Sequence, residues 1–523
     1  MFRSQLLYGF TFYNHCTTTQ KIQKRLNDSK AARWAALIIV SLTMMMAYFF
    51  TDVMGPLEAP LTTKGKLVYF EDGTYLSADS LMKISLKPIH CEEDITVGNT
   101  YNMMFLDSDG NMASKETTVT STINGLGWEA GDYGIFSGAY GYINVFLFML
   151  FFGGLILDKM GVRFTGIMST ALMFIGAAIK WYAVDNTFGG EMFGLPTQVV
   201  VACLGFAIYG MGAEIAGITV TKVIAKWFTG HEMALAMGLQ VALARIGTAF
   251  ALFFALPIAQ HFGLVSAPVM FGASALCIGL ISYIVYCVMD KKLDASIAGQ
   301  GVAEESEEQF KFSDLKYIFC NKGFWLITFL CLIFYAAVFP FLKFATNLMI
   351  IKYNVSPDLA GMIPGLLPFG TIFLTPFFGS IYDKVGKGAT LMIIGSVLLT
   401  VVHILFAMPL LNVWWFAVIV MIMLGIAFSL VPSAMWPSVP KIIPMKQLGS
   451  AYAIIFYIQN IGLSMVPVLI GNVIQANTAN GTTDYTQPMS IFALFGVIAV
   501  VISVLLKIVD KKNGYGLEES NIK

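Results

Sequence analysis

The feature that most constrains this chain is a series of twelve apolar runs, each of about 20 residues or more. A helix rises about 1.5 Å per residue, so each run can cross a hydrocarbon layer of ~30 Å. Hydrophobic residues make up 57% of the sequence and charged residues only 12%, which is typical of a polytopic membrane protein. We therefore predict an all-α membrane protein with twelve transmembrane helices in two bundles of six. The runs lie near residues 34–54, 136–157, 163–183, 197–223, 232–258, 266–289, 323–350, 358–382, 388–409, 412–436, 447–475 and 489–508.

Basic residues are concentrated in alternate loops. They precede the first run, and they join the second run to the third and the eighth to the ninth. The loops on the other side contain no Lys or Arg at residues 184–196, 259–265 and 476–488. Because cytoplasmic loops carry the excess of basic residues, both termini are expected in the cytoplasm.

Two stretches interrupt the series of runs and suggest a domain organisation. The longer one, 57–135, contains alternating segments such as KLVYF and TTVTSTI and a turn at Glu71-Asp72-Gly73, so we expect a small β-rich extracytoplasmic cap. This cap could bind an extracytoplasmic partner. The predicted units are a cytoplasmic segment 1–33, a first bundle 34–289 that includes the cap, a cytoplasmic linker 290–322, a second bundle 323–508 and a cytoplasmic tail 509–523.

Several functional classes find no support in the sequence. The net charge is zero and there is no basic stripe, which argues against nucleic acid as a partner. The seven cysteines form no CxxC pair, and we find no spacing typical of metal ligands, no nucleophile triad and no phosphate loop. We therefore expect neither an enzyme nor a cofactor or metal.

One loop motif occurs twice, at the same place in each half of the chain. An acid ends one helix, a glycine allows a tight turn, and basic residues follow at the membrane surface. Two copies at matching positions are far more specific than one. They resemble the signature loop of the major facilitator superfamily, which implies two six-helix bundles around a central cavity and alternating access. The motif residues are Gly154, Asp158, Lys159, Gly161 and Arg163 in the first copy and Gly379, Asp383, Lys384 and Gly386 in the second.

Glu214 and Arg245 are the most informative charged residues in the apolar runs. Each lies about 15 residues from the turn at Thr229 and Gly230, so both are predicted near the middle of the membrane. Charges at that depth are costly unless they face protein or water. They could neutralise one another as a buried ion pair. Alternatively they line the cavity, where the carboxylate receives the ammonium and the guanidinium receives the carboxylate of a zwitterionic solute.

Uncharged residues complete the candidate site. Gln459 and Asn460 lie near the middle of the eleventh run, where they could bond a peptide group or join neighbouring helices. Trp436 could close the cavity floor or mark the membrane interface. Tyr48 in the first run is a further candidate for the cavity wall. Lys343 lies high in the seventh run and is expected to snorkel outward.

A closer resemblance rests on two blocks, AEIAGITVTKVIAKWFTGHEMALAMGLQVALARIGTAF and SAMWPSVPKIIPMKQLGSAYAIIFYIQNIGL. They are similar to the lysosomal dipeptide uniporter family, major facilitator superfamily domain-containing protein 1, and its bacterial relatives. The resemblance implies that Glu214 and Arg245 engage the amino and carboxyl termini of a dipeptide. The long segment after the first run and the lack of an acidic dileucine signal depart from the lysosomal pattern. They favour a bacterial inner membrane as the location.

The sequence therefore predicts a membrane transporter for a small zwitterion, above all a dipeptide, working by alternating access. A uniporter is favoured because Glu214 is the one convincing acid inside the membrane. One alternative is an organic-anion exchanger that uses Arg245 alone, or a proton-coupled symporter of the same fold. The other is a receptor or scaffold without transport activity that acts through the cap.

Overall fold

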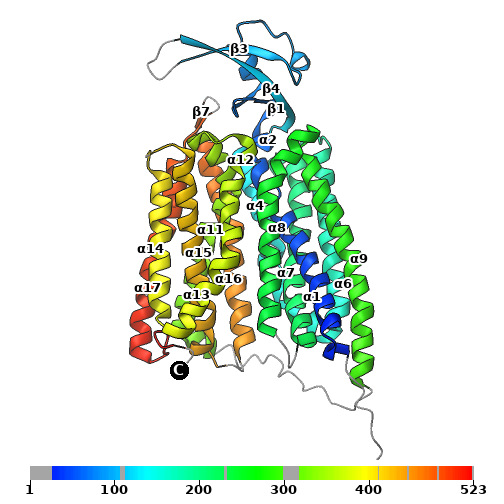
Figure 1. Ribbon diagram of the computed structural model, residues 1–523, viewed down its shortest axis with the longest axis vertical. Helices are drawn as coiled ribbons and strands as arrows, with labels where there is room; N and C mark the ends of the chain where they lie inside the picture. Colours follow the sequence, from blue (N-terminus) through cyan, green and yellow to red (C-terminus); the bar gives the residue numbers. More distant parts are fainter. Residues whose placement is uncertain are drawn as a thin grey trace, which may run out of the picture.

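The computed structural model describes residues 26–106, 112–228, 233–298, 317–409, 411–444, 447–479 and 482–520. Long helices lie side by side in two groups, and a small sheet lies across one end of the molecule (Figure 1). We call that end the cap side. The first described residues and the C-terminal residues both lie at the opposite end.

The helices follow the order of the apolar runs. The first group contains α1 (Lys30–Asp52), α4 (Ala130–Gly138), α5 (Tyr142–Phe146), α6 (Met149–Asp185), α7 (Thr197–Phe228), α8 (Met233–Phe262) and α9 (Ser266–Ala298). The second group contains α11 (Lys322–Tyr353), α13 (Met362–Val385), α14 (Gly388–Ala407), α15 (Trp414–Ile442), α16 (Leu448–Ala476) and α17 (Thr486–Asn513). Shorter helical segments are η1 (Leu26–Asp28), η2 (Gly55–Leu57), α2 (Glu58–Thr62), α3 (Ala78–Ile84), η3 (Glu92–Asp94), η4 (Ala139–Gly141) and α12 (Pro357–Ala360).

Within the described residues, eleven helices are long and apolar enough to cross a membrane, or twelve if one bent pair counts as a single span. The predicted mostly helical membrane fold is therefore confirmed. The second span differs from the continuous helix that we expected, because residues 130–146 and 149–157 are bent by 59° relative to one another. Between them Phe148 has a φ of 53°, and this left-handed conformation interrupts the helical hydrogen bonds.

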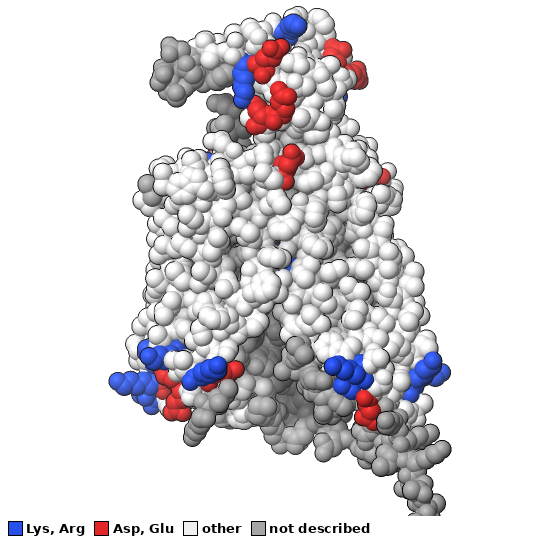
Figure 2. Space-filling view, in the orientation of Figure 1, with Lys and Arg blue, Asp and Glu red and all other residues white. Residues whose placement is uncertain are grey.

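A wide belt around the molecule is apolar. Large hydrophobic side chains remain exposed there on helices of both groups, for example Phe373 at 66%, Ile281 at 58% and Ile508 at 59%. Charged side chains gather on the cap and at the opposite end, and the belt between them is almost free of charge (Figure 2). Such a surface matches the hydrocarbon layer of a membrane.

The cap contains a four-stranded antiparallel sheet in the order β2-β1-β4-β3. Its strands are β1 (Lys64–Phe70), β2 (Tyr75–Ser77), β3 (Thr100–Leu106) and β4 (Met112–Leu126), and short hairpins elsewhere are β5 (Glu191–Met192) with β6 (Leu195–Pro196) and β7 (Thr478–Ala479) with β8 (Thr482–Thr483). Lys64 pairs with Leu126, so the chain enters and leaves the sheet at one point. A small core that includes Val68, Leu81 and Val119 lies between the sheet and α3.

The two groups of helices meet mainly toward the cap side. There α4 packs against α16, and α8 packs against α13. The contacts are very close: a Cβ on Gly361 would lie 1.9 Å from the Leu252 carbonyl oxygen, and one on Gly134 would lie 2.6 Å from that of Pro467. Glycine is therefore required where the halves touch. Toward the opposite end the two groups diverge (Figures 1 and 2).

Candidate functional site

Glu214 lies on α7, 14 residues before the helix ends at Phe228. Its side chain is half-buried. The hydroxyl of Tyr140, from η4, donates a hydrogen bond of 2.9 Å to its carboxylate. The Tyr140 ring packs in turn near Phe206 and Tyr209, with centroid distances of 5.6 and 6.2 Å. A neighbour from the second span thus fixes the direction of the carboxylate.

Arg245 lies on α8, 12 residues after the helix begins at Met233, and it is also half-buried. Its guanidinium carbon is 5.9 Å from the centroid of the Tyr48 ring, 5.3 Å from Phe339 and 5.6 Å from Phe428. These distances are typical of cation–π contacts. Because Tyr48 belongs to the first group and both phenylalanines to the second, Arg245 faces the space between the halves and not the lipid.

A helix rises about 1.5 Å per residue, so Glu214 lies about 21 Å from the end of α7 and Arg245 about 18 Å from the start of α8. Both of these helix ends lie opposite the cap, so the two charges are at a similar depth. The turn at Thr229 and Gly230 lies outside the described residues. Within the described part of the chain the two side chains form no ion pair with each other within 4.0 Å. Tyr48 is in electrostatic reach of both charges. Two opposite charges are thus available near one tyrosine.

Aromatic residues of the second half form a wall beside Arg245. The ring of Tyr335 lies 5.6 Å from those of both Phe339 and Phe428. Its hydroxyl accepts a hydrogen bond of 3.1 Å from the indole of Trp436, so Trp436 joins the wall instead of pointing to lipid. We did not predict Tyr335, Phe339 or Phe428 as site residues. The one available signal was the spacing of aromatic residues one turn apart in the seventh run.

Gln459 and Asn460 have different surroundings on α16. Gln459 accepts a hydrogen bond of 3.5 Å from the thiol of Cys331, which lies one turn from Tyr335 on α11. Gln459 therefore backs the aromatic wall. Asn460 is 2% exposed and its amide nitrogen donates to the Phe456 carbonyl oxygen of its own helix at 3.0 Å. Its position near Gly141 is that of a residue between packed helices.

An ion pair closes the space between the halves on the cap side. Lys343 Nζ of α11 lies 2.6 Å from Asp52 Oδ1 at the end of α1, and Thr248 donates to the other carboxylate oxygen at 2.8 Å. Tyr133 also donates to the Lys343 carbonyl oxygen at 2.9 Å. The expectation that Lys343 snorkels outward was wrong, because a carboxylate of the other half lies within reach of its ammonium group.

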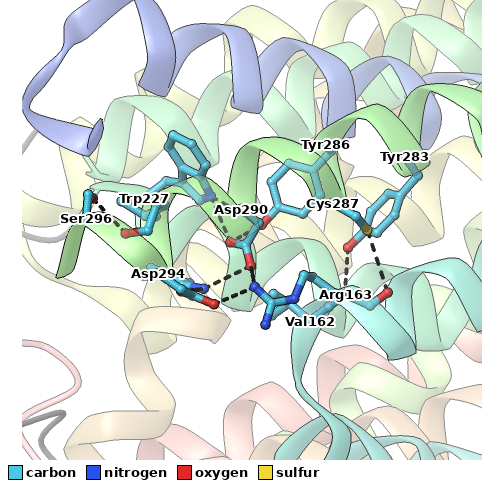
Figure 3. Close-up of polar contacts among 11 residues, drawn as sticks. Val162, Arg163, Trp227, Tyr283, Tyr286, Cys287, Asp290, Asp294 and Ser296 are labelled. Atoms are coloured by element: carbon cyan, nitrogen blue, oxygen red, sulfur yellow. Dashed lines mark hydrogen bonds and ion pairs between the residues drawn. The ribbon is translucent and has the colours of Figure 1, made fainter. Parts of the chain in front are cut away.

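The first signature loop turns at Gly161, whose φ is 74°. Arg163 Nη1 then lies 3.2 Å from Asp290 Oδ2 and 2.5 Å from Asp294 Oδ2, both on α9 (Figure 3). Lys226 of α7 contacts the same two carboxylates at 3.0 and 2.5 Å. These ion pairs join three helices of one half, so they stiffen that half and do not bridge the two halves.

The first signature loop contains three further motif residues, Gly154, Asp158 and Lys159. Lys159 is exposed, and no atom would lie within 4 Å of a Cβ on Gly154. The side chain of Asp158 lies outside the described residues.

The indole of Trp227 and the hydroxyl of Tyr286 both donate to Asp290 Oδ1, at 3.3 and 3.1 Å, which completes the burial of that acid (Figure 3).

The second signature loop has the same turn but other partners. Gly386 has a φ of 72°, Lys384 is exposed, Asp383 is half-buried, and Gly379 has no neighbour within 4 Å of a Cβ. Here the C-terminal segment packs against the loop, because the backbone N–H groups of Lys387 and Gly388 donate to the carbonyl oxygens of Glu518 and Leu517 at 3.0 and 2.8 Å. Glu518 accepts hydrogen bonds from the backbone and hydroxyl of Thr390, at 2.9 and 2.8 Å, at the start of α14.

These features define a class of protein, the alternating-access membrane transporters. They are two groups of helices, a loop motif repeated at one end, and half-buried opposite charges between the groups. The family model of the Major Facilitator Superfamily matches residues 102–467 and 344–519, so the chain belongs to this family.

Among named relatives, the chain is similar to the "Lysosomal dipeptide transporter MFSD1" of Bos taurus, with 28% identity over 393 residues, 73% of this chain and 78% of the relative. Among solved structures, it is similar to the nucleoside transporter NupG, with a TM-score of 0.60 and 13% identity over 91% of this chain and 98% of that one. It is also similar to a bacterial homologue of the human lysosomal transporter Spinster, with a TM-score of 0.61 and 12% identity over 93% and 99% of the two chains. At these identities the structures support the fold alone.

Proposed function

We propose that this protein transports small zwitterionic solutes, with dipeptides as the preferred class, by alternating access. The observation that carries the proposal is the placement of Arg245 between aromatic rings of both halves and of Glu214 at a similar depth beside Tyr140. A carboxylate and a guanidinium that are not paired with one another can bind the ammonium and carboxylate ends of one solute. The similarity to a relative named as a dipeptide transporter supports the same choice.

We further propose that transport is uniport. Asp52 is already paired with Lys343, which leaves Glu214 as the one acid of the proposed site, whereas a proton-coupled carrier usually uses a second titratable group. The segment 57–135 departs from the lysosomal pattern, and on that ground we propose a bacterial cell membrane as the location. Fractionation of the producing organism tests the location directly.

The function is tested by reconstituting the full chain in liposomes and measuring uptake of a labelled dipeptide, a single amino acid and a simple carboxylate. We expect saturable dipeptide uptake that changes by less than about twofold when a proton gradient is imposed. Uptake driven by the gradient would show a proton-coupled symporter. Carboxylate exchange that survives Glu214→Gln but not Arg245→Lys would show an organic-anion exchanger. A folded protein without any uptake would favour a receptor or scaffold.

A further inference from the structure

Lys180 is a buried lysine that the proposed transport site does not use. It lies on α6 and is 0% exposed. Its ammonium group is 4.4 Å from the centroid of the Phe50 ring and 4.2 Å from that of Phe206, and it donates to the Phe50 carbonyl oxygen at 3.4 Å. Within the described residues no carboxylate lies within 4.0 Å of it. A buried ammonium with such weak partners is costly, so its position calls for a role.

The role is suggested by the end of α1, where Lys180 and Lys343 converge. Carbonyl groups in the last turn of a helix lack partners within the helix, and the helix dipole makes this end negative. Lys180, from the first half, donates to the carbonyl oxygen of Phe50, and Lys343, from the second half, donates to that of Thr51 at 3.0 Å. The carboxylate of Asp52 at this end binds Lys343 and lies two residues from the Phe50 carbonyl group that Lys180 contacts.

Alternating access requires that the contacts on the cap side break. When they do, Lys343 leaves with α11, while Asp52, Thr248 and Lys180 stay together in the first half. The carboxylate of Asp52 would then keep the hydroxyl of Thr248 but lose its cation, and a charge left unpaired in this way is unfavourable. Lys180 is the cation of the same half that already reaches the same helix end.

We propose that Lys180 is a positioning residue of the cap-side gate, which takes over Asp52 when Lys343 withdraws. The exchange keeps Asp52 paired in both states and so makes the separated state accessible. It rests on the rocking of the two halves and not on the identity of the solute. A purely structural Lys180, held by aromatic packing, would act independently of Asp52.

The test is a double-mutant cycle of Lys180→Met and Asp52→Asn in the full chain. Spin labels at Phe262→Cys and Leu359→Cys, both exposed on the cap side, report separation of the halves once the seven native cysteines are replaced by Ser or Ala. We expect Lys180→Met to reduce the separated population and the turnover number by about tenfold, with KM changed much less. In the Asp52→Asn background, adding Lys180→Met should change the separated population and the turnover number by less than about threefold. Lys180→Arg alone should leave both quantities close to those of the parent.

Equal losses from Lys180→Met with and without Asp52→Asn would overturn the proposal. Lys352→Met is the matched control, because Lys352 also donates to backbone carbonyl oxygens on the cap side, but within the second half. It should show no coupling to Asp52.

A second measurement covers the case in which Lys180→Met fails to fold. Lys343→Met removes the ion pair that joins the halves, so it should increase the separated population. Because Lys180 can then pair with Asp52, this variant should melt within about 3 °C of the double variant Lys343→Met/Asp52→Asn. A melting temperature far below that of the double variant would mean that Asp52 is left unpaired, and would contradict the proposal.

Discussion

Glu214 and Arg245 are held by different kinds of partner, which decides what each substitution should do. Glu214 depends on one hydroxyl, that of Tyr140, whereas Arg245 is surrounded by three rings. A lysine keeps the charge of Arg245 but loses the planar group that stacks on rings and grips a carboxylate with two hydrogen bonds. The two charges therefore tolerate different changes.

The hydroxyl of Tyr140 should matter through the direction it gives to Glu214. A hydrogen bond to a charged group contributes about 1.5–3 kcal/mol, so Tyr140→Phe is expected to weaken dipeptide binding by about tenfold or more. The matched control is Tyr142→Phe, whose hydroxyl donates to the Ile135 carbonyl oxygen at 3.0 Å away from the charges. Calorimetric titration of both variants checks this, and equal affinities would contradict the role of Tyr140.

Single charged residues inside apolar runs, such as Glu214 and Arg245, can be recognised from the sequence. A charge inside a membrane has a high free-energy cost, so its presence there indicates a function. Lys180 gave the same signal inside the third run and was overlooked. The partners of these residues could not be predicted. Whether Phe339 or Phe428 faces Arg245 depends on the rotation of helices in the other half, and no local pattern records that rotation.

At the scale of helices and loops, the C-terminal segment is part of the second half. Leu517 is fully buried, and Glu518 binds the first turn of α14 and also lies 3.5 Å from Lys507. A carboxylate at a helix start stabilises unpaired backbone N–H groups.

Removing that carboxylate should loosen the second half without touching the transport site. Glu518→Ala is expected to cost about 1 kcal/mol and to lower the melting temperature by about 2 °C, with dipeptide affinity unchanged. Glu519→Ala is the control, because Glu519 is the next residue along the chain and is exposed. This variant should melt like the parent. Thermal unfolding in detergent measures both, and identical losses in the two variants would argue against a specific cap by Glu518.

The positions of most helices followed from the apolar runs, because membrane burial selects long apolar stretches whatever their partners. The bend at Phe148 could not be predicted from the sequence, because the run stays apolar on both sides of it. There Phe148 stacks on Tyr457 of the other half at 5.1 Å, a contact that exists only once the halves are assembled.

On the scale of the whole molecule, the cap touches both halves. Tyr75 donates to Asn347 of the second half at 3.2 Å, and the backbone of Asn124 donates to that of Gly263 in the first half at 3.5 Å. A cavity of about 550 Å³ lies beside this junction and is lined by residues of the cap, of the cap-side end of α8 with Gly263, and of α12. Contacts to both halves should favour the state in which they are closed on the cap side.

Deleting the sheet should therefore favour separation of the halves while leaving transport intact. Because Lys64 and Leu126 are paired, a short Gly-Ser linker can replace residues 64–126. We expect retained uptake and a larger separated population in spin-label distance measurements. A folded deletion variant without uptake would instead support the receptor or scaffold alternative.

The central claim is that Glu214 and Arg245 hold the two ends of one solute. Its most direct test is the binding of a dipeptide, its N-acetylated form and its C-terminal amide to the parent, Glu214→Gln and Arg245→Gln proteins. We predict that the parent binds the free dipeptide at least about tenfold more tightly than either blocked form. Glu214→Gln should lose discrimination only against the acetylated form, and Arg245→Gln only against the amide. Discrimination that stays unchanged in both variants would contradict the claim.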